Sequence, residues 1–440
     1  MSRFGKSLSV GWLPVSQALS LIASLAAFAV LSRELGPASY AQFAVFVFVY
    51  TMAALATDFS AMGFLLVHGV SRSLGRAAWS SSVVSATAGA VVLTAALLLL
   101  SFLELPTGPP RPLDVFILVC GLVAQSLIQP LRGKLMVFRR YPTIAVIDVG
   151  ATFVGFGSAI FLASQIHSVT VLCAQLALTS IARLLLTIVL SVVVGRKDAR
   201  ESAEAIISGT ALETPNPFRY GLKVLPLNVA SYASRAIDSG TLPLILPVGA
   251  AAAYARSYQL IVTPVTQVQL SLGGAIVERM ARRAAQPDDD GTFDKRVWKA
   301  LHLVTFLAAI VLSVSAPILE AIFFGPGWVH VALMISSMAL LLPSLTLSSF
   351  MSWKLQIRAK LRHSLLNLGV LLLVPMLAIV LGLLFSTNGA LIGLALGALV
   401  QGLALATLHR SLLPVTLRHA VIQIVVEWTV LAVLLLVRFV

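Results

Sequence analysis

Residues 364–409 read SLLNLGVLLLVPMLAIVLGLLFSTNGALIGLALGALVQGLALATLH, and this stretch decides the class of fold. It contains no Lys, Arg, Asp or Glu. Thr387-Asn388-Gly389 forms a short polar break between two apolar segments, each of roughly 20 residues, the length that crosses a bilayer as a helix. We therefore predict two spanning helices, 364–386 and 389–409, joined by a minimal turn.

The rest of the chain has the same apolar character. Of its 440 residues, 58% are hydrophobic and 11% are charged, and the mean hydropathy is +0.96. A soluble domain of this size needs a polar surface, and a disordered chain lacks apolar side chains, so both classes are excluded. The two cysteines, Cys120 and Cys173, lie in apolar stretches and are too few for a disulfide scaffold.

We predict an all-α polytopic membrane protein, because open sheet edges cannot face lipid and no barrel-like alternation is present. The expected architecture is twelve core transmembrane helices in two lobes of six, followed by a thirteenth helix at the C-terminus. The expected spans lie near residues 9–32, 41–68, 79–103, 113–131, 144–164, 169–194, 221–247, 253–277, 298–322, 329–351, 364–386, 389–409 and 420–437.

The net charge of +14 indicates orientation rather than nucleic-acid binding. With the N-terminus in the cytoplasm, 25 of the 31 Lys and Arg residues fall on the cytoplasmic side and 3 on the outer side. This bias is the one that orients membrane proteins, and one missed span would destroy it. The remaining three basic residues, Arg183, Arg235 and Arg256, lie inside predicted spans.

Two similar turns suggest an internal repeat. The turn at Leu35–Ala41 and the turn at Val248–Ala255 both place small residues before a Tyr-Ala pair that opens a helix. Each half would then hold six spans in one orientation, which predicts a pseudo-two-fold axis along the membrane normal. We expect an N-terminal lobe at 1–205, a C-terminal lobe at 206–415 and an extra hydrophobic segment at 416–440.

Several segments carry a resemblance to a known family. The segments 31–40 (LSRELGPASY), 233–238 (ASRAID), 253–260 (AYARSYQL) and 323–328 (FFGPGW) resemble the Wzx-type polysaccharide and O-antigen flippases. This family is part of the multidrug/oligosaccharidyl-lipid/polysaccharide (MOP) exporter superfamily. The sequence departs from the family pattern at 58–60, where Asp-Phe-Ser replaces the usual Asp-x-Gly.

The resemblance implies a V-shaped bundle of two lobes that works by alternating access. It implies a polyprenyl-pyrophosphate-linked oligosaccharide as the substrate, moved from the cytoplasmic to the outer leaflet of the bacterial inner membrane. Further expected partners are membrane lipids, glycosyltransferases and a polysaccharide polymerase, with no nucleic acid.

Charges inside a span cost roughly 3 kcal/mol each on insertion scales, so they are the first candidates for the site. Arg235 and Asp238 share one face of the seventh span. Either they only neutralise each other, or Arg235 holds the anionic headgroup while Asp238 tunes it. The planar guanidinium suits a pyrophosphate because it binds two oxygens at once. Arg256 either extends to the membrane surface or joins Arg235 in the substrate site.

Other polar residues have weaker assignments. Gln17 and Asn228 could line a sugar path, although hydrogen bonds between helices explain them equally well. Asp58 is a candidate ion-coupling site, with a helix-packing role as the alternative. Arg183 and Asp148 are expected to form a structural pair.

No catalytic, cofactor or metal motif was found in the sequence, so we expect a transporter rather than an enzyme. Without a nucleotide-binding loop, the energy would come from an ion gradient, the membrane potential or the substrate gradient. Three alternatives stay open: a drug/cation antiporter of the same superfamily, a membrane-embedded glycan polymerase or ligase, and a non-transporting scaffold. An antiporter favours acidic groups for its cations, and a polymerase usually has a large outer loop, which is missing here.

The charge bias gives a topology that can be tested by labelling. In a background without Cys120 and Cys173, single cysteines at Thr107 and Asn388 should react with an impermeant thiol reagent added to intact cells. A cysteine at Asp289 should react only after the membrane is permeabilised. Labelling of position 289 in intact cells would overturn the orientation.

Overall fold

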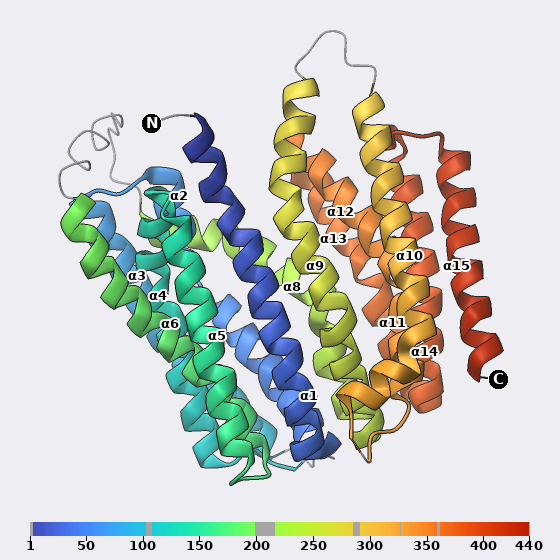
Figure 1. The fold of residues 1–440 in the computed structure, drawn as a ribbon, viewed down its shortest axis with the longest axis horizontal. Coiled ribbons are helices and arrows are strands. Elements are labelled where there is room, and N and C mark those ends of the chain that lie inside the picture. The colour runs from blue at the N-terminus through green and yellow to red at the C-terminus, as the bar shows by residue number, and fades with distance from the viewer. Residues whose placement is uncertain are drawn as a thin grey trace. The chain divides into compact units, whose positions relative to one another are not determined.

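The computed structural model describes residues 3–102, 108–198, 216–284, 291–325, 327–358 and 361–439. All regular elements among these residues are helical, as predicted (Figure 1). Nine helical stretches in the described part of the chain are long and apolar enough to cross a bilayer. The all-α polytopic membrane fold is therefore confirmed.

The first compact unit consists of Met1–Leu35 and Phe46–Val229. In it, α4 packs against α2, α3 and α6, while α5 packs mainly against α6. Its elements are most of α1 (Arg3–Ala56), α2 (Ala61–His68), α3 (Arg72–Ser101), α4 (Pro112–Val137), α5 (Tyr141–Ala163), α6 (Val169–Asp198) and the start of α8 (Pro217–Ile245).

The second compact unit consists of Gly36–Val45 and Ala230–Val440. Here α9 and α10 both contact α11 and α12, and α15 packs against α10 and α14. Its elements are the rest of α8, α9 (Val248–Ala284), α10 (Thr292–Phe323), α11 (Val331–Ala339), α12 (Leu342–Ile357), α13 (Leu361–Leu371), α14 (Leu373–Leu408), a 3-10 turn at Arg410–Leu412 and α15 (Leu417–Phe439).

Helix α1 contains the first predicted turn as a sharp kink. Gly36 has φ 67° and ψ 174°, a backbone conformation that residues with a Cβ rarely adopt. The chain leaves the first unit at this glycine and returns to it at Phe46. The segment Gly36–Val45 thus belongs with the second unit, although it lies near the N-terminus. The predicted lobe boundaries and the pseudo-two-fold relation remain predictions.

Two predicted spans are each interrupted by a proline. The segment 329–351 is divided into α11 and α12, and the segment 364–386 is divided into α13 and the start of α14. Pro343 and Pro375 lie four residues after the last residues of α11 and α13. Because proline lacks the N–H and its ring clashes with the carbonyl four residues earlier, the helix breaks at these points.

The predicted span 41–68 is also interrupted, here by an unwound turn at residues 57–60. The Asp58 carboxylate accepts a hydrogen bond from the Ser60 N–H at 2.7 Å, and Ser60 has a positive φ of 51°. A Cβ on Gly221 would lie 2.5 Å from the Phe59 Cα, so α8 packs directly against this turn. A side chain that bonds to its local backbone competes with the helix, which explains the break.

Helix α14 folds back on itself next to the predicted turn. Phe385 and Ser386 leave the helical conformation, and three glycines spaced four residues apart follow. A Cβ added to Gly389 would lie 1.9 Å from the Leu381 carbonyl oxygen. A Cβ added to Gly393 would lie 2.4 Å from the Leu377 carbonyl oxygen. Small residues at this spacing let two helical arms approach closely inside a membrane.

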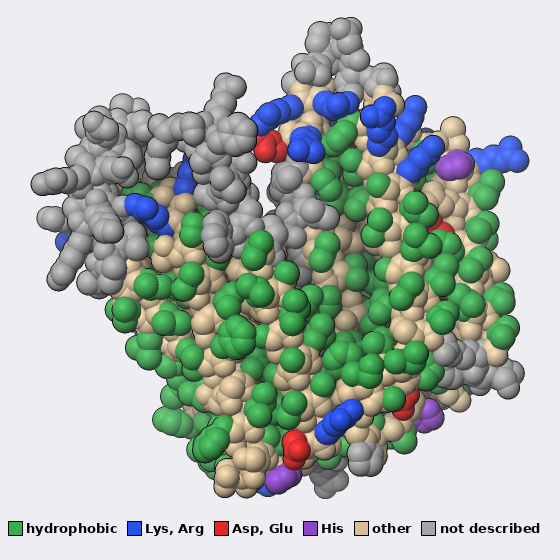
Figure 2. Space-filling view, in the orientation of Figure 1, with side chains coloured by type: hydrophobic (Ala, Val, Ile, Leu, Met, Phe, Trp, Pro, Cys, Tyr) green, Lys and Arg blue, Asp and Glu red, His purple; other side chains and the backbone are tan. Residues whose placement is uncertain are grey.

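The surface of the second unit has the pattern expected of a membrane protein. Hydrophobic side chains cover its sides in Figure 2, and Lys and Arg side chains gather at the ends of α9 and α10. The exposed basic residues there are Arg279, Arg282, Arg283, Lys295, Arg296 and Lys299. All of them lie between the predicted spans 253–277 and 298–322 or at the start of the latter, on the side predicted to be cytoplasmic.

The close packing at Gly393 makes this glycine essential for the fold of α14. In Gly393→Ala, the added methyl would meet the backbone, so we expect a loss of about 1–3 kcal/mol of stability. Gly369→Ala is the matched control, since no atom lies within 4 Å of a Cβ there. Thermal unfolding in detergent measures both, and equal stability of the two variants would contradict the packing argument.

Candidate functional site

Asp238 is a buried carboxylate whose described partners are neutral. It lies on α8 with 3% of its surface exposed. The Tyr254 hydroxyl donates to one carboxylate oxygen, and the Ser239 N–H donates to the other at 2.8 Å. Tyr254 lies in the second turn of α9, so this contact joins two consecutive helices. The Arg235 side chain lies outside the described residues, so its expected pairing with Asp238 stays a prediction.

A small pocket adjoins Asp238 inside the second unit. Its volume, open mouth included, is about 420 Å³, and its polar lining comes from Ser234, Asp238, Tyr258, Thr266 and Gln401. The Gln401 side chain is 1% exposed, and its amide nitrogen has no hydrogen-bond partner among the described residues. The pocket suits ordered water or a small ion, because water needs two to four polar partners.

Arg256 is enclosed by aromatic rings. The guanidinium carbon lies 3.5 Å from the centre of the Tyr40 ring and 5.9 Å from the centre of the Phe43 ring. The Arg256 Nη1 group donates a hydrogen bond to the Gln259 side-chain oxygen. Desolvated contacts of this kind between a cation and a ring are worth about 2 kcal/mol. The side chain is buried within the second unit, with 8% of its surface exposed. Its substrate role stays a prediction.

The Arg256 contacts bring three distant sequence segments together. Tyr40 packs on Trp328 at 5.5 Å between ring centres, and Trp328 packs on Phe324 at 4.9 Å. Tyr40, Arg256 and Trp328 belong to the three segments 31–40, 253–260 and 323–328. These sequence signatures therefore have a packing role in the second unit.

The weaker candidates from the sequence are dispersed. Gln17 is exposed on α1 and Asn228 is half-buried on α8. Asp58 lies in the unwound turn after α1, where it accepts the hydrogen bond from Ser60. The structure does not bring these three residues together with Asp238 in one described set of contacts.

The expected pair of Arg183 and Asp148 is present, with an additional partner. The Arg183 Nε lies 3.0 Å from Asp148 Oδ1. Arg132 also binds Asp148, through two parallel hydrogen bonds of 2.9 and 2.8 Å. Arg132 was not expected to pair with Asp148, because it follows the predicted end of the fourth span, where a basic residue is usually an orientation signal. Helix α4 continues to Val137, beyond the predicted span, and therefore holds Arg132 within the helix.

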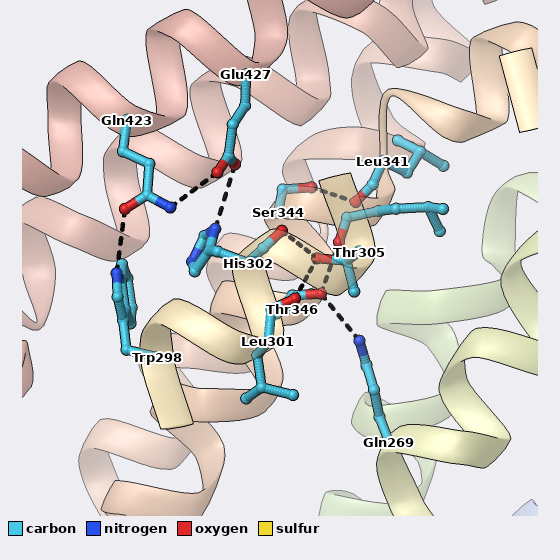
Figure 3. Close-up of polar contacts among 11 residues, drawn as sticks. Gln269, Trp298, Leu301, His302, Thr305, Leu341, Ser344, Thr346, Gln423 and Glu427 are labelled. Carbon is cyan, nitrogen blue, oxygen red and sulfur yellow. Dashed lines mark hydrogen bonds and ion pairs between the residues drawn. The ribbon is translucent and has the colours of Figure 1, made fainter. Parts of the chain in front are cut away.

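A buried polar network attaches α15 to α10 (Figure 3). The Trp298 indole donates to Gln423 at 3.1 Å, the Gln423 amide donates to Glu427 at 2.8 Å, and His302 Nδ1 lies 3.2 Å from Glu427. Glu427 is 6% exposed. The neighbouring Trp428 indole donates to the Ala395 carbonyl of α14 at 2.7 Å.

A second hydrogen-bonded set in Figure 3 joins α9 to α12. The Gln269 amide donates to the Thr346 hydroxyl at 3.1 Å and accepts from Ser349 at 2.7 Å. A polar side chain in a membrane helix can either line a substrate path or form hydrogen bonds to a neighbouring helix. The structure shows the hydrogen bonds between helices.

Comparison of the sequence with known families identifies the chain. The profile of the family described as "Polysaccharide biosynthesis protein" matches residues 30–333. The chain belongs to this family. No curated protein matches the sequence.

Comparison with solved structures shows that membrane transporters have a similar fold. The lipid II flippase MurJ in an inward closed conformation matches with a TM-score of 0.60 and 11% identity, over 95% of this chain and 97% of that one. A MOP superfamily transporter from Pyrococcus furiosus matches with a TM-score of 0.58 and 11% identity, over 97% of this chain and 96% of that one. An inward-facing multidrug resistance MATE transporter matches with a TM-score of 0.54 and 14% identity, over 94% of this chain and 95% of that one. The resemblance stated from the sequence is thereby confirmed.

The network at Glu427 predicts that α15 is anchored by its polar contacts. Glu427→Ala leaves the His302 ring and the Gln423 amide unpaired in a buried place, which costs about 1–3 kcal/mol. Glu278→Ala is the control, because it removes an exposed ion pair with Arg282, and such pairs contribute little. We expect a lower unfolding temperature in detergent for Glu427→Ala alone. A similar effect of both substitutions would argue against an anchoring role.

Proposed function

We propose that the protein is a flippase for a lipid-pyrophosphate-linked oligosaccharide repeat unit. In this proposal it moves the unit from the cytoplasmic to the outer leaflet of the bacterial inner membrane, with its N-terminus in the cytoplasm. The two halves of the chain would work by alternating access. Glycosyltransferases would supply the substrate, and a polysaccharide polymerase would consume it.

The observation that carries the proposal is the family match, together with the fold. A member of a polysaccharide biosynthesis family that consists almost entirely of membrane-crossing helices is best suited to a transport step. One of the structures with a similar fold is a flippase for lipid II. Transport also accounts for the absence of recognisable catalytic motifs in the sequence.

The charges inside the described helices favour an anionic substrate over a cationic drug. Asp148 is held between two arginines, and Arg256 is buried among aromatic rings. A carboxylate bound to two guanidinium groups is poorly suited to carry a cation, because both would have to be displaced. This argues against the drug/cation antiporter.

The test is loss of export with accumulation of the substrate. Deleting the gene should abolish one surface polysaccharide, and lipid-linked repeat units should accumulate in the membrane. Mass spectrometry of lipid extracts measures the accumulation. A deletion strain with normal polysaccharide but increased sensitivity to cationic drugs would contradict the flippase and favour the antiporter.

The same assay tests Arg235, which lies one turn before Asp238 on α8. A pyrophosphate must leave water to cross the membrane, and without a fixed cation this desolvation costs many kcal/mol. We expect Arg235→Ala to be inserted normally but to abolish export, and Arg235→Lys to retain partial export because the charge survives.

The control for this substitution is Arg296→Ala, which removes an exposed arginine from α10 and should export normally. Normal export by a well-expressed Arg235→Ala variant would remove Arg235 from the substrate site.

A further inference from the structure

A cluster with excess positive charge lies inside the first unit, where α4, α5 and α6 meet. Arg132 forms a bidentate ion pair with Asp148, and Arg183 approaches the same carboxylate from α6. Among the residues that the structure describes, neither arginine has a second acidic partner. Two guanidinium groups thus share one carboxylate, which leaves one positive charge.

The surroundings of the cluster are polar but neutral. The Tyr50 hydroxyl donates to Gln125 at 2.8 Å and also interacts with Ser180. The Thr152 hydroxyl donates to the backbone carbonyl of Asp148 at 2.8 Å. None of these groups carries a charge that could balance the second arginine.

The depth of the cluster makes the uncompensated charge costly. Arg183 lies 14 residues after the first residue of α6, so about 20 Å along the helix at 1.5 Å per residue. A charged side chain this far from the helix ends is rare and usually functional. An opposite charge near Arg183 would remove most of this cost.

Both arginines of the cluster are partly exposed. The side chains of Arg183 and Arg132 are 31% and 25% exposed. Arg183 contacts Asp148 through Nε, and its two terminal Nη groups have no hydrogen-bond acceptor in the described part of the chain. Those groups are the donors that bind two oxygens of one oxyanion at once.

We propose that Arg183, together with Arg132, forms a binding site for a phosphate-type oxyanion within the first unit. Asp148 fixes the two arginines and prevents them from turning away, while the Nη groups of Arg183 bind the ligand. The phosphate belongs either to the lipid-linked substrate or to an anionic phospholipid headgroup. The inference rests on the proposed function only for the first of these sources.

The experiment measures binding of inorganic pyrophosphate to the purified full-length protein in neutral detergent. An Arg235→Ala background removes the other expected anion site. We expect Arg183→Gln to weaken binding at least tenfold, and Arg183→Lys to weaken it less because the charge is retained. Arg418→Gln removes an exposed arginine from α15 and should bind like the background protein.

The Asp148→Asn variant distinguishes a cluster that binds a ligand from a cluster that only forms structural ion pairs. This substitution removes a negative charge beside the ligand but leaves an amide oxygen that can still accept hydrogen bonds from the arginines, so pyrophosphate binding should tighten severalfold. If the cluster only holds helices together, Asp148→Asn binds no more tightly and Arg183→Gln binds equally well, and either result overturns the proposal. If Arg183→Gln does not fold, Arg183→Lys and Asp148→Asn decide the question.

Nanodiscs of neutral lipid then identify the source of the phosphate. Arg183-dependent binding of added polyprenyl phosphate assigns the site to the substrate, and Arg183-dependent binding of phosphatidylglycerol assigns it to a lipid headgroup. If the deletion strain exports normally while pyrophosphate binding depends on Arg183, the proposed function fails and the anion site stands. If lipid-linked units accumulate while the Arg183 variants bind normally, the anion site fails alone.

Discussion

A charged side chain that leaves water needs a partner inside the protein, and most of the polar architecture of this chain follows from that constraint. Asp238 is held by Tyr254, Arg256 by the ring of Tyr40, and Glu427 by His302. Each contact also joins two different parts of the chain. The same partners that lower the cost of a charge thereby fix the packing of the helices.

This constraint explains the segment Gly36–Val45. Its flanking residues belong to the first unit, yet the segment itself belongs to the second. Tyr40 is 2% exposed, and its ring stacks on the Arg256 guanidinium. Without this segment, that buried guanidinium would lack its aromatic partner. The kink at Gly36 permits this arrangement because the chain changes direction there without steric strain.

The sequence predicted the class of fold because hydropathy and charge bias are local properties that can be counted. These local properties did not locate the helix breaks at residues 57–60 and before Pro343. The first combines a local hydrogen bond from the Ser60 N–H to Asp58 with the packing of α8 against Phe59, which is a tertiary interaction. The second break is caused by Pro343, which lies inside a continuous apolar segment and therefore left the hydropathy pattern unchanged.

The candidate site shows the same division. The partnership of Arg183 and Asp148 could be expected from two opposite charges in neighbouring spans, and the structure contains it. Arg132 was missed, because a basic residue near a span end is normally an orientation signal. The aromatic partners of Arg256 could not be inferred, since Tyr40 lies more than 200 residues away.

The partners of the buried carboxylates separate two kinds of transport chemistry. Asp148 is held by fixed positive charges, so taking up a cation there would require breaking two strong ion pairs. Asp238 differs, because its described partners are a phenol and a backbone N–H, and a small pocket lies beside it. A cationic cargo would have to compete with the arginines for Asp148, whereas an anionic cargo would not.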